Sequence, residues 1–157
     1  MKKITKSILT LFILSISVTN ISAQTKPTPE AAMSFLNFYY KGQGQGVVLA
    51  DIKISTEIVE NECVDTVAID SLKNGIQYYL WMLYVVPKDD QVDDIIIHFN
   101  YGGLTRFTRD VSVRGSIRYR TWKSFILNRS GKWEIKVLHD REDEVETLST
   151  LALTVIY

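Results

Sequence analysis

Four predicted β-strands follow one another in residues 95–140, IIIHFNYGGLTRFTRDVSVRGSIRYRTWKSFILNRSGKWEIKVLHD. Apolar and polar residues alternate along much of this stretch, which is typical of strands with one buried face. Gly102-Gly103 separates the first two strands, and Arg129-Ser130-Gly131 separates the last two. Both are turn signals. The stretch therefore predicts two β-hairpins in series, and it carries both histidines of the chain.

The second hairpin has a predicted register that assigns each side chain to a face. A three-residue loop with Gly131 in the left-handed conformation pairs Asn128 with Lys132 and turns Trp133 toward the core. A loop of two or four residues is the alternative, and it would bury Trp122 instead. On the outer face, the favoured register places Trp122 opposite Leu138, Arg120 opposite Asp140 and Arg118 opposite Glu142.

The flanking segments complete an all-β pattern. Residues 47–58 alternate like a half-buried strand, and residues 76–86 are apolar on both alternations, as in the centre of a sheet. Pro87 and the acidic residues 88–94 should end that strand, and Gly115-Ser116 should turn the chain back. A last strand is expected at 147–157, while 64–69 is left open as a possible short strand. About seven strands predict an antiparallel, immunoglobulin-like β-sandwich.

A short helix should precede the sandwich. Thr28 can cap it, with Pro29 at its first position and Glu30 in its first turn. Gly42 is placed to end the helix, and the Gly/Gln-rich residues 42–46 form a linker. We therefore divide the chain into residues 1–23, residues 24–46 with the helix and linker, and residues 47–157 as the sandwich domain.

Residues 1–23 are typical of a secretory signal peptide. Lys2, Lys3 and Lys6 precede the apolar stretch Ile8–Val18, and Ser22-Ala23 fits a cleavage site. A periplasmic or secreted protein is expected, with an uncleaved membrane anchor as the alternative. Cleavage would leave 15 basic against 18 acidic residues, a formal charge of −3. That charge argues against a nucleic-acid-binding protein.

Cys63 is the single cysteine of the chain. An internal disulfide is therefore impossible, although an exported protein could form one. We expect a free, inert thiol. The alternative is a disulfide with another chain.

A set of spaced residues resembles a bacterial envelope family. The set comprises Ile96-x-His98, Gly102-Gly103, Val111-x-Val113, Tyr119-Arg120-Thr121-Trp122-x-Ser124 and Gly131-x-Trp133-x-Ile135-x-Val137. Over residues 63–155 it resembles the domain-of-unknown-function family twenty-nine-fourteen. Asn100 stands where that family has an aromatic residue, and Tyr119 where it has Trp. The resemblance implies a β-sandwich exported to or attached at the envelope, with no assigned catalytic residue.

Basic residues gather on the strand that carries Trp122. Residues 104–132 hold eight basic residues and one acid, whereas residues 51–94 hold ten acids and three lysines. Arg118, Arg120 and Trp122 alternate, so they share an outward face on which a guanidinium could stack on the indole. They are the candidate ligand-binding residues, for an anionic partner such as a carboxylate, a phosphate or an acidic glycan. The alternative is that neighbouring strands only complement each other's charge.

Other side chains are weaker candidates for chemistry. His98 and His139 lack metal-ligand spacing, so structural roles are expected. Four aspartates between 88 and 94 could hold Ca²⁺, but their spacing and lack of glycine differ from known calcium loops. We expect a non-catalytic binding or scaffolding protein of the envelope, without metal or cofactor. The alternatives are an envelope-polymer hydrolase using Glu134 or Asp140, and a calcium-dependent adhesion module.

Overall fold

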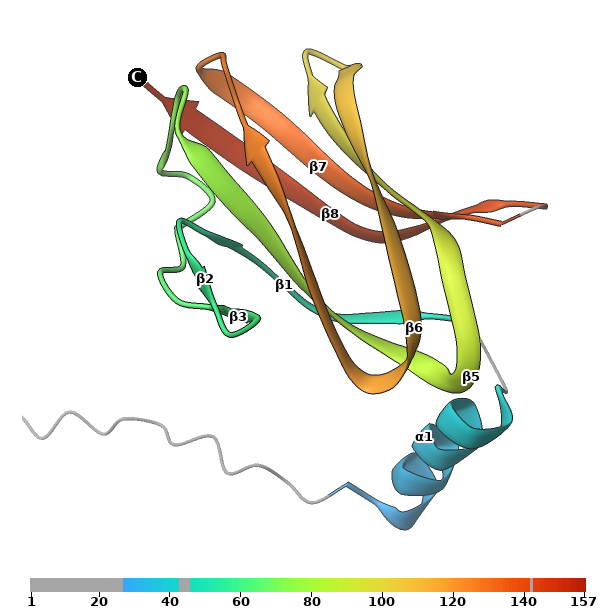
Figure 1. Cartoon of the computed structure of the whole chain (residues 1–157). Helices are drawn as coiled ribbons and strands as arrows, with labels where there is room; N and C mark the ends of the chain where they lie inside the picture. The colour runs from blue at the N-terminus through green and yellow to red at the C-terminus, as the bar shows by residue number, and fades with distance from the viewer. Residues whose placement is uncertain (1–26, 43–45, 142) are drawn as a thin grey trace, which may run out of the picture.

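The computed structural model describes residues 27–42, 46–141 and 143–157 (Figure 1). The predicted signal peptide lies outside these residues, as do positions 43–45 of the linker. The elements are helix α1 (Pro29–Lys41) and strands β1 (Val48–Ser55), β2 (Ile58–Val59), β3 (Glu62–Cys63), β4 (Leu72–Lys73), β5 (Gln77–Tyr101), β6 (Leu104–Ile126), β7 (Gly131–Asp140) and β8 (Val145–Ile156).

Helix α1 begins and ends at the predicted residues. The Thr28 hydroxyl accepts a hydrogen bond from the Ala31 N–H at 3.2 Å, Pro29 begins the helix, and Gly42 caps it with φ 60°. The helix lies beside the bend of β5 (Figure 1), and none of its side chains is buried. In the described ranges, no helix has the length and apolar composition needed to cross a bilayer.

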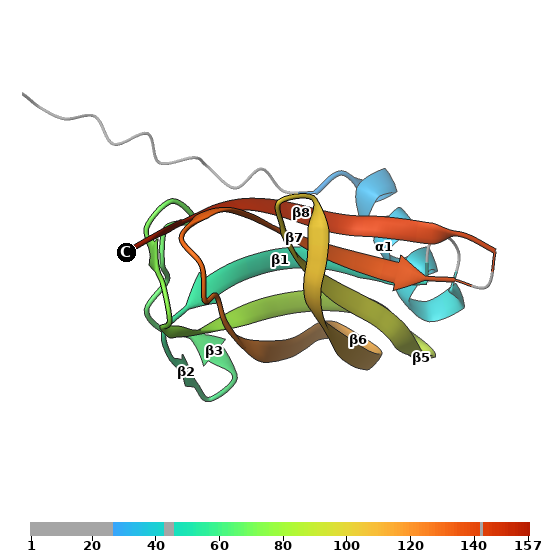
Figure 2. The ribbon, with the colours of Figure 1, turned by 90° about the horizontal axis from the view of Figure 1, so that it is seen from above.

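Strands β5 and β6 run through both layers of the molecule. Strand β5 pairs with β1 through its first half and with β7 through its second, while β6 follows it along both halves. We call β1 with residues 77–86 and 116–126 the front layer. The back layer comprises residues 91–101 and 104–114 with β7, β8 and β4. Viewed from above, the two layers lie face to face (Figure 2).

The layers meet at a corner where both long strands bend. Val86 pairs with Ser116 and Gln91 with Arg114, so four residues of β5 lie opposite one residue of β6, Gly115. A Cβ on Gly115 would lie 2.0 Å from the Lys88 carbonyl oxygen, so only glycine permits this approach. Such bulges bend a strand and increase its twist. The predicted loop at 88–94 and turn at Gly115-Ser116 are therefore wrong, because the strands continue through them.

The core lies between the two layers. The front layer contributes buried Leu80, Met82 and Tyr84, and the back layer contributes Ile97 and Phe99. The rings of Phe99 and Phe125 are 5.1 Å apart across the layers. The predicted antiparallel, immunoglobulin-like β-sandwich is confirmed, with β5 at its centre. One short pair departs from it, since β4 is parallel to β8.

The first predicted hairpin is confirmed and the second is wrong. Gly102 and Gly103, with φ of 61° and 78°, join β5 to β6 in a two-residue turn. Residues 127–130 instead carry the chain from the front layer to the back layer, so β6 does not pair with β7. Two aromatic donors fix this crossing: Trp133 Nε1 bonds the Arg129 carbonyl at 2.8 Å, and Tyr101 Oη bonds the Ser130 carbonyl at 3.1 Å.

The prediction that Trp133 points into the core and Trp122 points outward is correct, but the residues opposite them in the sheet differ from the predicted ones. Trp133 is buried in the core, and Trp122 points outward from the front layer. Trp122 lies opposite Trp81 on β5, and Arg120 lies opposite Leu83. The predicted pairs of Trp122 with Leu138 and of Arg120 with Asp140 do not form. The pair of Arg118 with Glu142 involves a residue outside the described ranges.

Candidate functional site

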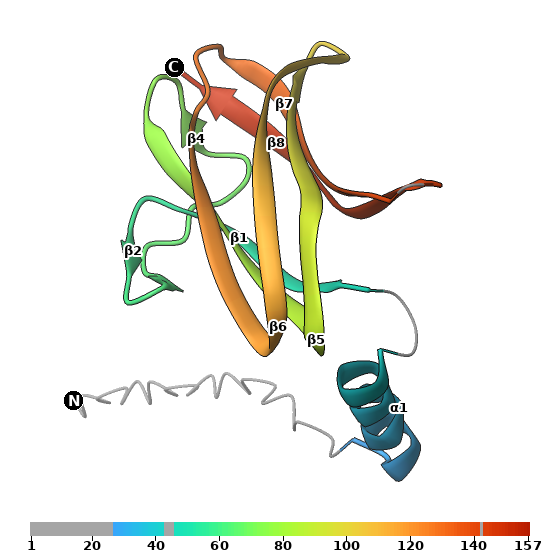
Figure 3. The same cartoon turned by 45° about the vertical axis from the view of Figure 1, so that its right-hand side comes forward.

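The three candidate residues share the outer face of the front layer, as predicted. Arg118, Arg120 and Trp122 lie on the second half of β6, and 36% of the Trp122 surface is exposed. Figure 3 shows the course of β6 beside β5. Trp81 lies directly opposite Trp122 on β5 but is only 3% exposed. We call the outer surface around Arg118, Arg120 and Trp122 the Trp122 face. This face also contains residues that were not predicted to belong to it, because another segment of the chain lies against the front layer.

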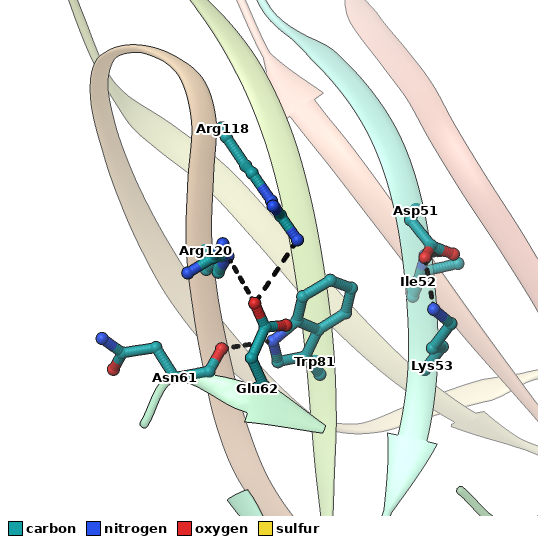
Figure 4. Close-up of polar contacts among 8 residues, drawn as sticks. All are labelled: Asp51, Ile52, Lys53, Asn61, Glu62, Trp81, Arg118 and Arg120. Atoms are coloured by element: carbon teal, nitrogen blue, oxygen red, sulfur yellow. Dashed lines mark hydrogen bonds and ion pairs between the residues drawn. The ribbon is translucent and has the colours of Figure 1, made fainter. Parts of the chain in front are cut away.

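The additional segment is the ribbon formed by β2 and β3. Ile58 pairs with Cys63 and Val59 with Glu62, around a turn in which Glu60 and Asn61 have φ of 50° and 65°. The Asn61 carbonyl accepts a hydrogen bond from Trp81 Nε1 at 2.8 Å (Figure 4). The ribbon therefore covers Trp81 and satisfies its one polar atom.

The sequence contained a signal for the ribbon that the prediction did not use. Asn61 is a residue type that tolerates the left-handed conformation and favours two-residue turns. Each strand of the ribbon has only two residues, which is too short for a visible alternation. Cys63 lies on β3 as a free, half-buried thiol. A disulfide with another chain stays the untested alternative to the predicted inert thiol.

Glu62 on the ribbon joins both arginines of the Trp122 face. Its Oε1 lies 2.9 Å from Arg120 Nε and 3.4 Å from Arg118 Nη2 (Figure 4). The Arg120 contact is an ion pair without hydrogen-bond geometry, since its buried Nε has no hydrogen-bond partner in the described structure. The Arg118 side chain is 60% exposed and that of Arg120 28%. Two guanidinium groups thus converge on one carboxylate oxygen at a partly exposed site.

The expected stacking of arginine on Trp122 does not occur in the described residues. The cation on this face that lies over an indole is Lys53, whose Nζ is 5.3 Å from the centre of the Trp81 ring. Lys53 also pairs with Asp51 at 2.6 Å, which raises the pKa of Lys53. The arginines are instead directed toward Glu62, so charge pairing decides their orientation.

A second polar surface lies on the outer face of the back layer, over a shallow hollow of about 740 Å³. Thr105 Oγ1 donates to Asn100 Oδ1 at 2.8 Å, and Asn100 Nδ2 donates to Glu134 Oε1 at 3.1 Å. Lys136 Nζ lies 3.2 Å from the same Glu134 oxygen. The Asn100 hydrogen bond, followed by that of Lys136, lowers the pKa of Glu134. Glu134 is thus held as a carboxylate, whereas a general acid needs a raised pKa.

The histidines and the acidic segment also have defined places. His139 is buried, with Nε2 3.2 Å from Asp94 Oδ1, and its Nδ1 accepts a hydrogen bond from Arg141 Nε at 3.2 Å. This is the structural role predicted for it. His98 is half-buried and lines the hollow of the back layer. In the described part of the chain, no three or more His, Cys, Asp or Glu side chains are grouped to hold a metal ion.

Solved structures of similar architecture include an immunoglobulin-like protein from Pseudomonas aeruginosa. It is 12% identical, with coverage of 73% of this chain and 98% of that chain, and a TM-score of 0.48. The CARDB domain of a Pyrococcus furiosus protein is 14% identical, with coverage of 71% and 94% and a TM-score of 0.39. A crystal structure of that domain in complex with di-metal ions gives 13% identity, coverage of 75% and 98%, and a TM-score of 0.36.

No family model matches the chain, and no curated protein matches it. The resemblance to the domain-of-unknown-function family stays a prediction. The assignment of the fold rests on the strand order and on the corner between the layers.

Proposed function

We propose that this chain is an exported, non-catalytic β-sandwich module of the cell envelope that binds an anionic partner through the Trp122 face. The observation that carries the proposal is the convergence of Arg118 and Arg120 on one carboxylate beside a partly exposed indole. A guanidinium offers several directed donors to a carboxylate or phosphate oxygen. An anionic group of a partner could therefore take the place of Glu62.

The Trp122 indole adds apolar contact area to this charge recognition. Tryptophan and arginine are enriched among the residues that contribute most to protein interfaces. Trp122 keeps about a third of its surface exposed, while Trp81 opposite it is covered by the ribbon. The sheet holds the backbone of Trp122 and Arg120 in place, which lowers the entropy lost on binding.

Two features support export without catalysis. The pattern of residues 1–23 and the resemblance to an envelope family both favour an exported protein. The carboxyls proposed for a hydrolase lie apart from a common site, because Glu134 lines the hollow of the back layer and Asp140 does not. A retaining or inverting glycosidase needs two carboxyl groups across one substrate.

The proposal is tested by capture of a partner from envelope extract on the immobilised chain. Trp122→Ala and Arg120→Ala should lose the captured partner, with an affinity at least about tenfold weaker in direct titration. Arg114→Ala is the matched control, because Arg114 is exposed on the same strand but lies in the back layer. Equal capture by all four proteins would contradict the proposal.

Glu62→Gln distinguishes a site that an anionic partner can enter from an ion-pair group that only stabilises the fold. If Glu62 occupies the position of the partner's anionic group, removing its charge should strengthen binding severalfold. Melting curves show whether each variant is folded. A variant with lower stability and unaltered capture would assign Trp122 a purely structural role.

A further inference from the structure

Strand β6 has an unpaired edge along its whole length. It pairs with β5 in both layers, and no other strand of the described chain pairs with it. Backbone groups of an antiparallel strand point alternately to its two sides, so about half of those in β6 face away from β5. Some are satisfied locally: Arg109 Nη1 donates to the Thr108 carbonyl at 2.9 Å. An edge of this kind is a template for an added strand.

A hollow of about 310 Å³ opens beside this edge, between the two halves of β6. Phe107 from the back layer and Phe125 and Ile126 from the front layer line it. Phe99 lies beneath, with its ring 4.3 Å from that of Phe107 and 5.1 Å from that of Phe125. The hollow is thus an aromatic opening into the core, large enough for one apolar side chain.

Three arginines lie at this end of the sandwich over aromatic rings. Arg109 lies 5.3 Å from the centre of Phe107, and Arg106 and Arg129 each lie 5.8 Å from the centre of Tyr101. Within residues 27–42, 46–141 and 143–157, none of the three forms an ion pair, whereas Arg118 and Arg120 share Glu62. Their charge is available to an acidic partner.

We propose that the free edge of β6 at residues 104–114 binds an extended acidic polypeptide segment as an additional strand. One apolar side chain of that segment would enter the hollow between Phe107 and Phe125. Its acidic side chains would meet Arg106, Arg109 and Arg129. This surface is distinct from the Trp122 face, which lies on the outside of the front layer.

Charge selects the occupant of the edge. Strand β6 carries six basic residues and one acid, Asp110. Two copies of β6 side by side would place arginines near arginines, and like charges opposite one another are destabilising. A basic edge therefore disfavours a second copy of this chain and favours an acidic strand. If the arginines serve only to keep the edge unpaired, no acidic strand will bind.

The first test uses a labelled synthetic peptide of about ten residues in which glutamate and valine alternate, followed by fluorescence anisotropy. We expect saturable binding to the whole chain. A version with N-methyl groups on all backbone nitrogens has no N–H donor on either side of the strand, so it should bind at least about tenfold more weakly. A lysine–valine peptide should not bind. Equal binding of the methylated peptide would overturn strand addition and leave only charge attraction.

The second test locates the peptide on the chain. Arg109→Gln and Arg106→Gln should each weaken binding severalfold, and Ile126→Ser should do so by altering the hollow. Lys73→Gln is the matched control, since Lys73 is exposed on β4, which pairs with β8 rather than β6. Bound peptide should slow hydrogen exchange of the amides in residues 104–114. Unchanged exchange there, or an equal loss in Lys73→Gln, would overturn the proposed location.

Discussion

The two outer faces of the sandwich satisfy their charged groups in different ways. On the back layer, Glu134 is held by Asn100 across the ladder and by Lys136 two residues along its own strand. On the front layer, Arg118 and Arg120 are held by Glu62, which comes from a ribbon more than fifty positions earlier in the chain. The charged groups of the back face therefore find their partners within their own sheet. The two arginines of the front face find theirs on the separate ribbon.

This difference also explains the two tryptophans of the front face. Trp81 lies on the central strand β5 between Lys53 of β1 and Trp122 of β6, whereas Trp122 lies on a strand with one unpaired edge, so the sheet already shields Trp81 more than Trp122. The ribbon covers Trp81 and accepts its indole N–H, and Trp122 stays partly exposed. A partner that binds the front face can thus use Trp122 without displacing Trp81.

The largest expected effect distinguishes these two tryptophans. Trp81→Ala should lower the free energy of unfolding by about 3–5 kcal/mol, because it removes a buried indole and leaves the ribbon without its anchor. Trp122→Ala is the matched control and should cost less, because about a third of the Trp122 surface is exposed and no ribbon residue bonds its indole N–H in the described structure. Urea denaturation followed by circular dichroism measures both. Equal losses would show that the ribbon does not set the difference between the two sites.

A smaller loss is expected at the corner that separates the faces. Gly115→Ala adds a Cβ whose ideal position is 2.0 Å from the Lys88 carbonyl oxygen. The backbone of β5 or β6 must shift, at a cost of about 1–3 kcal/mol. Because the corner is shared, hydrogen exchange should accelerate in both layers. Gly46→Ala is the control, since nothing lies within 4 Å of a Cβ there.

Removal of the Glu62 charge should have a still smaller effect on stability. All three side chains of this ion-pair group are partly exposed, so Glu62→Gln should cost about 0.2–1 kcal/mol at low salt. The difference from wild type should shrink in about 1 M NaCl, where charges are screened. Lys136→Gln gives the corresponding measurement on the back face. A loss at Glu62 that is insensitive to salt would point to packing of the ribbon rather than charge.

Local spacing predicted part of this architecture. Alternation predicted the sandwich, the central place of β5 and a shared face for Arg118, Arg120 and Trp122. The outward direction of that face is correct, although it was predicted from the register of a hairpin that does not form. From the sequence, we interpret Gly115 and Gly131 as turn residues. A glycine indicates an unusual backbone conformation or a close approach of two backbones, but it does not indicate which of these occurs. In the structure Gly115 permits close contact at a corner, and Gly131 begins β7 after the chain has crossed between layers.

The partner of the two arginines could not be predicted for a related reason. The predicted hairpin offered Asp140 and Glu142, which follow from a register within 25 residues of sequence. Glu62 reaches them only because the short ribbon folds over Trp81. Such a contact depends on tertiary packing, and neither the periodicity of β6 nor the charge of β3 specifies it.

The smallest expected effect is a shift of the pKa of Glu134 on the back face. The hydrogen bond from Asn100 contributes most to the lowering of this pKa, and the contact with Lys136 lowers it further. A carboxyl whose pKa is lower in the folded state than in the unfolded state contributes stability above the unfolded pKa. That contribution is lost as the pH falls through the folded pKa. Asn100→Ala should therefore move the Glu134 pKa upward, toward its ordinary value.

Carboxyl NMR chemical shifts during an acid titration measure this change directly. Thr105→Val is the matched control, because Thr105 bonds Asn100 and not Glu134, so its effect on the Glu134 pKa should be smaller. Since Glu134 is open to solvent, the midpoint of thermal unfolding should hardly change at neutral pH. An unaltered Glu134 pKa in Asn100→Ala would show that Lys136 holds the carboxylate. The back face would then resemble the front face, where cations alone fix the acid.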